Sequence, residues 1–279
     1  MEIERSEEIK ELLRLSEDEI ISRAGERLVV KDSLDELYQD FSDHLAGLIL
    51  ERNAMKKATR VILPVGPEDQ YPLFAERVNH DKIDLSRAFF FFMDEYSGTL
   101  GKALPAEHPL SLKSVFKRLF LDRLEKEPPV ENIIFPDEKN ITALAALISE
   151  DRIDVCYGGI GIHGHIAFNE PEPGVENTGP RRVRLNDYTV TINAMRAGVG
   201  GDIENFPREA FTIGMSQVLS ATTIRLYSRS IPPFDWAKTT LRLALFGEQG
   251  WDYPVTFIRE SEYTIVTDRA TLKPPEILL

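Results

Sequence analysis

One segment of the sequence concentrates the residue types that carry out acid–base chemistry. Residues 158–171 read Gly-Gly-Ile-Gly-Ile-His-Gly-His-Ile-Ala-Phe-Asn-Glu-Pro, with four glycines in the first seven positions. Glycine lets the backbone adopt positive φ and come close to a ligand. His163 and His165 are two of the five histidines, and Glu170 follows them. Because an imidazole titrates near neutrality and a carboxylate can orient it, the segment predicts acid–base catalysis on a small polar substrate.

Two other chemistries can use the same segment. Residues 159–164 fit the G-x-G-x-x-G spacing of a dinucleotide site, but no acidic residue stands at the expected distance on a following strand, so this signal is weak. His163, His165 and Glu170 also resemble the first motif of the cupins, in which two imidazoles and a carboxylate bind a divalent ion. Cupins are all-β proteins, and the sequence does not predict eight alternating strands. A metal-dependent enzyme that uses these three residues stays open as an alternative.

A second candidate acid–base group follows a different apolar run. Asp94 comes directly after residues 88–93, which include four consecutive phenylalanines. Burial beside these rings would raise the carboxyl pKa from its ordinary value of about 4, which suits a base that removes a proton from carbon. The competing role for Asp94 is to cap the following turn, as aspartate often does.

The composition excludes several classes of function. The 279 residues include 33 Lys and Arg against 46 Asp and Glu, a net charge of −13, and no basic patch is present to attract nucleic acid. The single cysteine, Cys156, rules out an intramolecular disulfide. The charged N-terminus does not resemble a signal peptide, and the longest apolar run is far shorter than the ~20 residues of a membrane helix. We therefore expect a cytoplasmic protein with neither a nucleic-acid nor a membrane partner.

The elements that must position the candidate residues alternate along the chain. Continuous apolar runs are typical of strands in a parallel sheet that helices cover on both faces. They occupy residues 61–63, 89–93, 133–135, 153–157, 211–213 and 264–266. Helical patterns separate them, which predicts an α/β fold with a doubly wound, mainly parallel sheet flanked by helices. Ligands of such sheets bind beyond the carboxyl ends of the strands, where Asp94 and residues 158–171 are expected.

The N-terminal part of the chain has a different character. Residues 1–30 are acidic and prone to form helix, and we interpret them as a helical extension of a single domain spanning residues 31–279. Ser33 and Glu36 have the spacing of a capping box. Apolar residues then recur at helical spacing up to Ile49, so a helix begins at Leu34 and packs on the sheet.

Two separated segments carry a resemblance to a known family. Residues 161–171, with the sequence Gly-His-Ile-Ala-Phe-Asn-Glu-Pro at their end, resemble the signature of the glucosamine-6-phosphate deaminase/isomerase family. Residues 93–98, Met-Asp-Glu-Tyr-Ser-Gly, resemble its other catalytic segment. The resemblance extends from about residue 61 to the end of the chain and leaves residues 1–30 outside. Because the related 6-phosphogluconolactonases lack the Phe-Asn-Glu-Pro ending, residues 168–171 favour the deaminase branch.

The resemblance implies a mechanism for an amino-sugar phosphate. His165 would carry a proton to or from the ring oxygen, and Asp94 would move a proton from C2 to C1 before ammonia leaves. Glu170 would hold the imidazole in the useful tautomer and favour its charged form, with His163 beside it. The glycines implied in substrate binding are Gly66, Gly161 and Gly164. The family needs no cofactor, and its members form homo-oligomers, so we expect one here.

The sequence departs from the family pattern at two places. His163 stands where the family usually has an aspartate, and a second imidazole should lower the pKa of His165. Residues 64–69 read Pro-Val-Gly-Pro-Glu-Asp where the family's phosphate loop reads Pro-Thr-Gly-Gly-Thr-Pro, so two carboxylates stand where a dianion would bind. Arg196 and Arg229 are the candidate ligands of a substrate anion. The substrate is thus predicted to be a sugar or sugar phosphate, with a non-catalytic sugar-binding sensor as the alternative function.

Overall fold

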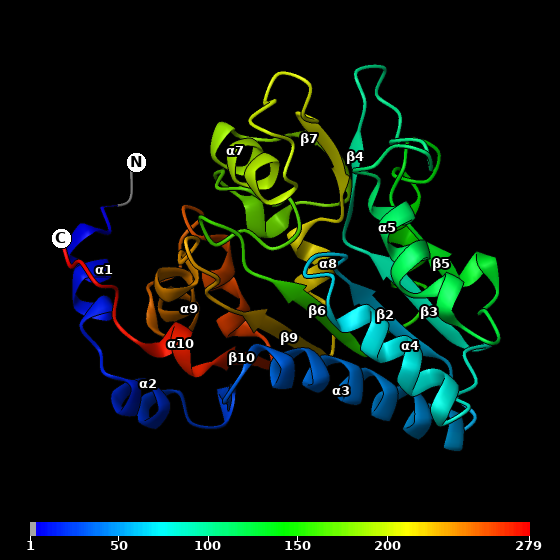
Figure 1. Ribbon diagram of the computed structural model, residues 1–279, viewed down its shortest axis with the longest axis horizontal. Coiled ribbons are helices and arrows are strands. Elements are labelled where there is room, and N and C mark those ends of the chain that lie inside the picture. The colour runs from blue at the N-terminus through cyan, green and yellow to red at the C-terminus, as the bar shows by residue number, and fades with distance from the viewer. Residues whose placement is uncertain (1–3) are drawn as a thin grey trace.

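A seven-stranded parallel sheet forms the centre of the computed structural model, which describes residues 4–279 (Figure 1). Its strands are β1 (Leu28–Lys31), β2 (Thr59–Leu63), β3 (Ala88–Phe92), β5 (Ile133–Ile134), β6 (Val155–Gly159), β9 (Thr223–Ser228) and β10 (Tyr263–Asp268). They lie in the order β1-β10-β9-β6-β2-β3-β5, and every neighbouring pair is parallel. The predicted fold class is confirmed.

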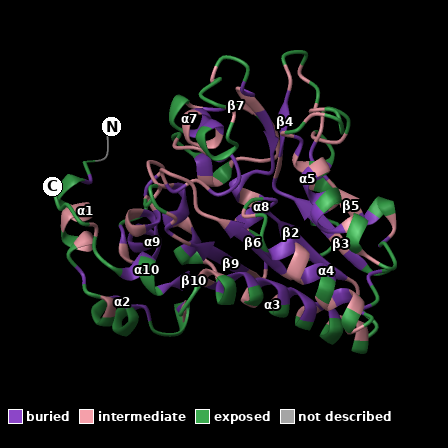
Figure 2. Ribbon diagram, viewed as in Figure 1, coloured by how far each residue is buried: buried purple, intermediate pink, exposed green. Residues whose placement is uncertain are grey.

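Helices cover both faces of this sheet. The helices of the described chain are α1 (Ser6–Leu13), α2 (Glu17–Ala24), α3 (Leu34–Ala54), α4 (Gln70–His80), α5 (Leu112–Leu119), α6 (Leu144–Ser149), α7 (Asp187–Arg196), α8 (Met215–Leu219), α9 (Ala237–Phe246) and α10 (Arg269–Leu272). Of these, α7 packs on a separate, smaller sheet. Successive strand residues enter opposite cores: Phe90 and Phe92 pack with α3, α4 and α5, whereas Phe91 packs with α6, α8 and α9. The five interior strands are buried along most of their length (Figure 2), which explains their apolar character, whereas the edge strands β1 and β5 are only partly buried.

A second, smaller sheet lies beyond the carboxyl ends of the parallel strands, in the upper part of Figure 1. It consists of β4 (Asp94–Ser97), β7 (Arg181–Arg184) and β8 (Glu209–Thr212), antiparallel in the order β4-β8-β7. The prediction that residues 211–213 form a strand of the parallel sheet was therefore wrong. The segment is apolar because Ala210, Phe211 and Ile213 are all buried, and burial on both sides gives the same pattern in either kind of sheet.

The chain reverses its direction of progress across the sheet between β2 and β6. From β2 it continues to β3 and β5 on one side, and from β6 it continues to β9 and β10 on the other. This is the topological switch point, where ligands of such sheets bind. The loops that follow these two strands meet there, since a Cβ on Gly159 would lie 3.8 Å from the carbonyl oxygen of Gly66.

The N-terminal helices and α3 begin much as the sequence indicates. The hydroxyl of Ser33 accepts a hydrogen bond from the Glu36 amide, although the Glu36 carboxylate reaches the Asp32 amide instead of closing the predicted box. Ahead of α3, α1 packs on α9, and Arg5 pairs with Asp252. Strand β1 already joins the sheet at Leu28, so the predicted boundary between residues 30 and 31 falls inside a strand. The division into an extension and a domain stays a prediction. Within residues 4–279, no helix has the length and apolar character to cross a membrane.

Candidate active site

Asp94 stands where the chain leaves the parallel sheet and enters the antiparallel one. The amide of Met93 donates to the Leu63 carbonyl (2.9 Å), and the Ile213 amide donates to the Met93 carbonyl (2.8 Å), so the backbone is held from both sides. The Asp94 carboxyl is half-buried and has no hydrogen-bond partner among residues 4–279. Burial, and then the charge of Glu95, raise its pKa to about 7. The predicted rise is confirmed, and such a carboxyl can serve as a base near neutral pH.

Glu95, which the sequence analysis did not single out, fixes the strand that carries Asp94. Its buried carboxylate accepts hydrogen bonds from the amides of Leu112 (3.0 Å) and Lys113 (2.8 Å) in the first turn of α5. The Ser111 hydroxyl donates to it as well (3.2 Å). Glu95 therefore turns away from Asp94 and anchors β4 to the positive end of a helix.

The glycine-rich loop after β6 folds tightly around His165. The Gly161 amide donates to the His165 carbonyl (2.9 Å), and a Cβ on Gly161 would lie 2.0 Å from His165 Nε2. Gly164 has φ of +73°, and a Cβ there would lie 3.0 Å from the ring of Tyr253. Only glycine fits at either position. Both residues thus place the imidazole, while their contact with substrate stays a prediction.

His163 and His165 face one another through the same ring atom. Their Nδ1 atoms are 3.1 Å apart, and the ring centroids are 4.9 Å apart. Desolvation contributes most to lowering the pKa of His165 to about 3, and electrostatic repulsion from His163 adds to it. Desolvation lowers the pKa of His163 too. The predicted lowering by a second imidazole is confirmed, but the expectation that His165 titrates near neutrality was wrong, because the surrounding protein desolvates the half-buried ring and disfavours its charged form at pH 7.

Glu170 lies beside the two imidazoles but does not bond to them. Its Oε2 accepts a hydrogen bond from the backbone amide of Asn186 (2.8 Å), the residue that caps α7. Its Oε1 is buried without a hydrogen-bond partner in the described part of the chain, and burial raises the carboxyl pKa. The expected direct hold of Glu170 on His165 is absent between these described residues, because the start of α7 brings a closer donor to the carboxylate.

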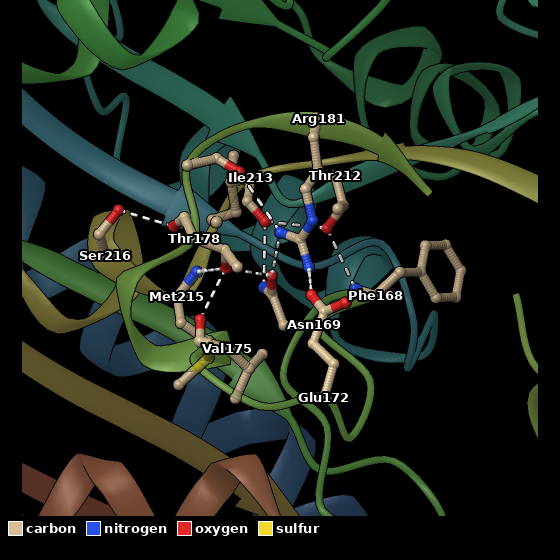
Figure 3. A network of polar contacts seen from close by, with 12 residues as sticks. Phe168, Asn169, Glu172, Val175, Thr178, Arg181, Thr212, Ile213, Met215 and Ser216 are labelled. Atoms are coloured by element: carbon tan, nitrogen blue, oxygen red, sulfur yellow. Dashed lines mark hydrogen bonds and ion pairs between the residues drawn. The ribbon is translucent and has the colours of Figure 1, made fainter. Parts of the chain in front are cut away.

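Asn169 ties the end of the loop to the antiparallel sheet (Figure 3). Its amide nitrogen donates to the carbonyls of Ile166 and Ile213 (both 3.0 Å), and its oxygen accepts from the Arg181 guanidinium (2.8 Å). Asn169 is fully buried, so these partners satisfy an amide that water cannot reach. Asn169 belongs to the Phe-Asn-Glu-Pro motif, but the sequence alone does not indicate this structural role.

Strand β8 joins the loop to the strand of Asp94. Thr212 pairs with Asp94 across β8 and β4, and its hydroxyl accepts a hydrogen bond from the Phe168 amide (3.1 Å). The rings of Tyr96 and Phe168 pack with a centroid separation of 5.6 Å. The Asp94 and His165 segments, which are far apart in sequence, are therefore fixed by one strand.

The candidate anion ligands lie at the edge of the same region. Arg196 ends α7 with its guanidinium 6.0 Å from the ring of Trp236, and Arg229 follows β9 with its guanidinium 5.4 Å from the ring of Tyr38. Partial desolvation and the positive charge of Arg229 lower the pKa of Arg196, and the charge of Glu68 opposes this. The two arginines and the exposed Glu68 are thus near enough to interact electrostatically.

Gly66 lies in the loop after β2, beside these charged groups. No heavy atom of the described chain lies within 4 Å of a Cβ built on Gly66, so the space beside this residue is open. Asp69, on the same loop, raises the pKa of Tyr38, although burial of the phenol contributes more. The loop therefore presents carboxylates toward the arginines, as its sequence predicted.

The three residues of the metal-dependent alternative do come together, but their surroundings do not suit an ion. One ligand atom from each of His163, His165 and Glu170 lies within 4.8 Å of the others. A histidine that binds a metal through Nδ1 normally donates its Nε2 proton to an acceptor. Here the Asn186 side-chain nitrogen, a donor, faces His163 Nε2 at 2.5 Å. This arrangement favours a neutral pair of imidazoles over a metal centre.

Sequence relatives place the chain in a family. The glucosamine-6-phosphate deaminase of Rhodopirellula baltica is 31% identical over 244 residues, which cover 84% of this chain and 91% of the relative. The chain belongs to the glucosamine-6-phosphate deaminase family. The deaminase of Parabacteroides distasonis is 28% identical over 207 residues, 71% of this chain and 73% of the relative. No protein-family model matches the chain.

Solved structures share the fold of this deaminase-family chain. A monomeric glucosamine-6-phosphate deaminase superposes with a TM-score of 0.77 at 22% identity, covering 89% of this chain and all of the other. The 6-phosphogluconolactonase of Trypanosoma cruzi superposes with a TM-score of 0.65 at 14% identity, covering 90% and 97% of the two chains. The family and fold predicted from the sequence motifs are confirmed, and the chain is a divergent member of an enzyme family.

Proposed function

We propose that the chain is an enzyme that converts an amino-sugar phosphate of the glucosamine-6-phosphate class into a ketose phosphate and ammonia. The observation that supports this most directly is the Asp94 carboxyl, which is half-buried, unpaired among residues 4–279 and titrates at about 7. It follows β3, the neighbour of β2 beside the switch point, and is tied through Thr212 to the loop that carries His165. The deaminases among the relatives supply the substrate class.

The reaction begins with the closed sugar ring. His165 meets the ring oxygen as a neutral imidazole, because its pKa of about 3 leaves it uncharged at pH 7. A neutral imidazole polarises an oxygen by donating a hydrogen bond. The ring opens as the C1 hydroxyl gives up its proton and the ring oxygen gains one. The Asp94 carboxylate then removes the C2 proton of the open aldose while the carbonyl oxygen takes a proton from the substrate's ammonium group, which gives an enolamine. Asp94 returns its proton to C1, and the enolamine becomes a C2 iminium. Water adds to C2 and ammonia leaves, so no oxidant or reductant is required.

We expect the site to bind a phosphate group more weakly than the family motif implies. Arg196 and Arg229 supply positive charge, but Glu68 lies near enough to offset part of it. The loop that carries Glu68 also lacks the hydroxyls of the family motif. We therefore expect sugars with and without a 6-phosphate to differ less in affinity than a dedicated phosphate site would make them.

Exchange of the C2 hydrogen tests the function. Glucosamine-6-phosphate is incubated with the protein in D2O, and deuterium at C2 and free ammonia are measured. We expect both in the wild type and neither in Asp94→Asn, while Asp151→Asn, at an exposed position before the amino end of β6, behaves as wild type. Saturable sugar binding with neither exchange nor ammonia would instead support the non-catalytic sensor.

Assembly and location remain proposals. The homo-oligomer expected from the family is tested by sedimentation velocity, and a monomer is the competing outcome because one structural relative is described as monomeric. We propose a cytoplasmic location on the basis of the single cysteine, Cys156, which is buried and free.

A further inference from the structure

The side chain of Asn186 has a fixed orientation. Asn186 is the N-cap of α7, and its side-chain oxygen accepts a hydrogen bond from the Thr189 amide (2.9 Å). Its backbone amide donates to Glu170 Oε2 (2.8 Å), which holds the residue in place. Because the oxygen is committed to the helix, the side-chain NH2 group must point to the other neighbour, His163.

This orientation determines where the protons of both imidazoles lie. The Asn186 side-chain nitrogen is 2.5 Å from His163 Nε2, so that ring nitrogen is an acceptor and the neutral His163 ring carries its proton on Nδ1. Nδ1 of His163 is 3.1 Å from Nδ1 of His165. The His163 proton therefore points at His165 Nδ1, which must be the acceptor. The neutral His165 ring then carries its own proton on Nε2.

We propose that Asn186 and His163 are positioning residues that hold His165 as the neutral tautomer with its proton on Nε2. His165 Nε2 has no hydrogen-bond partner among the described residues, and the half-buried ring lies against Gly161, where a Cβ would be 2.0 Å from Nε2. Because Gly161 has no side chain, this N–H stays available to a substrate oxygen. The proposal rests on the proposed function for the identity of that oxygen. The assignment of the protons rests on the geometry alone.

The relay, which is the hydrogen-bonded chain from Asn186 through His163 to His165, runs in the opposite direction to the one that an aspartate at position 163 would impose. A carboxylate can only accept, so it would draw the His165 proton to Nδ1 and leave Nε2 as an acceptor. His163 does the opposite, because its Nε2 accepts from the Asn186 amide group and its Nδ1 donates to His165. The His165 proton then stays on Nε2. His163 thus makes His165 a hydrogen-bond donor toward substrate without giving it a charge.

Nitrogen NMR on the protein without substrate tests the proton assignment. In histidine-labelled protein at pH 7.5, long-range ¹H–¹⁵N correlations distinguish protonated from unprotonated ring nitrogens, and His163→Gln assigns the signals. We expect a protonated Nε2 and an unprotonated Nδ1 in His165, with the reverse in His163. A His165 ring that carries its proton on Nδ1 would overturn the proposal.

Two substitutions of Asn186, the N-cap of α7, test whether this residue determines the two tautomers. Asn186→Asp keeps an oxygen for the Thr189 amide but offers His163 only an acceptor, so both tautomers should reverse. kcat should fall about 100-fold or more with little change in KM. Asn186→Ser also caps the helix yet is too short to reach His163, so it should give mixed tautomers and a smaller loss of kcat. Unchanged tautomers in the folded Asn186→Asp protein would refute the relay.

The two proposals can fail separately. If the wild type shows the expected tautomers but neither C2 exchange nor ammonia release, the relay stands and the proposed function is wrong. If the wild type is an active deaminase with the proton of His165 on Nδ1, the function stands and the relay is wrong.

Discussion

Replacing the proposed catalytic base should make the folded protein more stable. The pKa of Asp94 rises from 3.8 to about 7 because burial disfavours its charged form. The folded protein therefore binds this proton more tightly than the unfolded chain does. The stability that the protonated carboxyl contributes is fully present below about pH 4 and is lost as the pH rises through about 7. Asp94→Asn removes the ionisation while keeping the shape of the side chain.

The size of the effect follows from the shift. A change of about 3 pKa units corresponds to roughly 4 kcal/mol at about 1.36 kcal/mol per unit. Asp94 retains some contact with solvent, which screens part of this cost, so we expect Asp94→Asn to gain about 2–4 kcal/mol at pH 8.5. At pH 4 the gain should be close to zero, because the wild-type carboxyl is then protonated in the folded protein.

Urea denaturation at pH 4, 6 and 8.5 measures the difference. The expected gain grows from pH 4 to 7 and is constant above about 8. Asp151→Asn, at an exposed turn before β6, is the matched control and should show no such pH-dependent gain. A difference between wild type and Asp94→Asn that is the same at all three pH values would refute the desolvation of Asp94, and with it the argument for its role as base.

Three further outcomes follow from the charges of the site. The kcat/KM of the wild type should rise with pH through about 7 as Asp94 loses its proton, with no limb near 6.5 from His165, as a pH–rate profile will show. His163→Asp should raise the pKa of His165 by about 1–3 units, because a carboxylate favours the imidazolium; an NMR titration checks this. Glu68→Gln combined with Asp69→Asn should tighten binding of phosphorylated sugars roughly fivefold, more at low salt, and leave unphosphorylated sugars unchanged in calorimetry.

Most of the parallel sheet could be predicted because its strands are apolar on both faces. The predicted runs at 133–135 and 264–266 overlap β5 and β10, whereas β1 was missed, and so was β9. Its buried residues Arg225 and Tyr227 interrupt the apolar pattern, and both are satisfied by Asp40 on α3, at 2.6 and 2.9 Å. A buried ion pair between distant segments cannot be read from local periodicity. The antiparallel sheet was missed for a related reason, since its pairing depends on long-range register.

The sequence could predict the site residues that lie in loops directly after strands. It could not predict the contact that the start of α7 makes with one of them. The residue types at 94, 163, 165 and 170 carry their chemistry in the sequence itself, and the α/β pattern places them at one edge of the sheet. Asn186 has the residue type of an N-cap, which predicts where a helix begins. Its contact with His163 spans 23 residues and exists only once α7 packs on the small sheet.

Burial in this site disfavours the charged forms of its acid–base groups, and the departure at position 163 suits that condition. Burial raises the pKa values of Asp94 and Glu170 and lowers that of His165. An aspartate at position 163 would add a third carboxylate and raise the cost of ionising the other two. His163 adds no charge and still orients the neighbouring ring through Asn186. Asp94 is then the group whose ionisation governs the site near pH 7, which is the condition for it to act as the base.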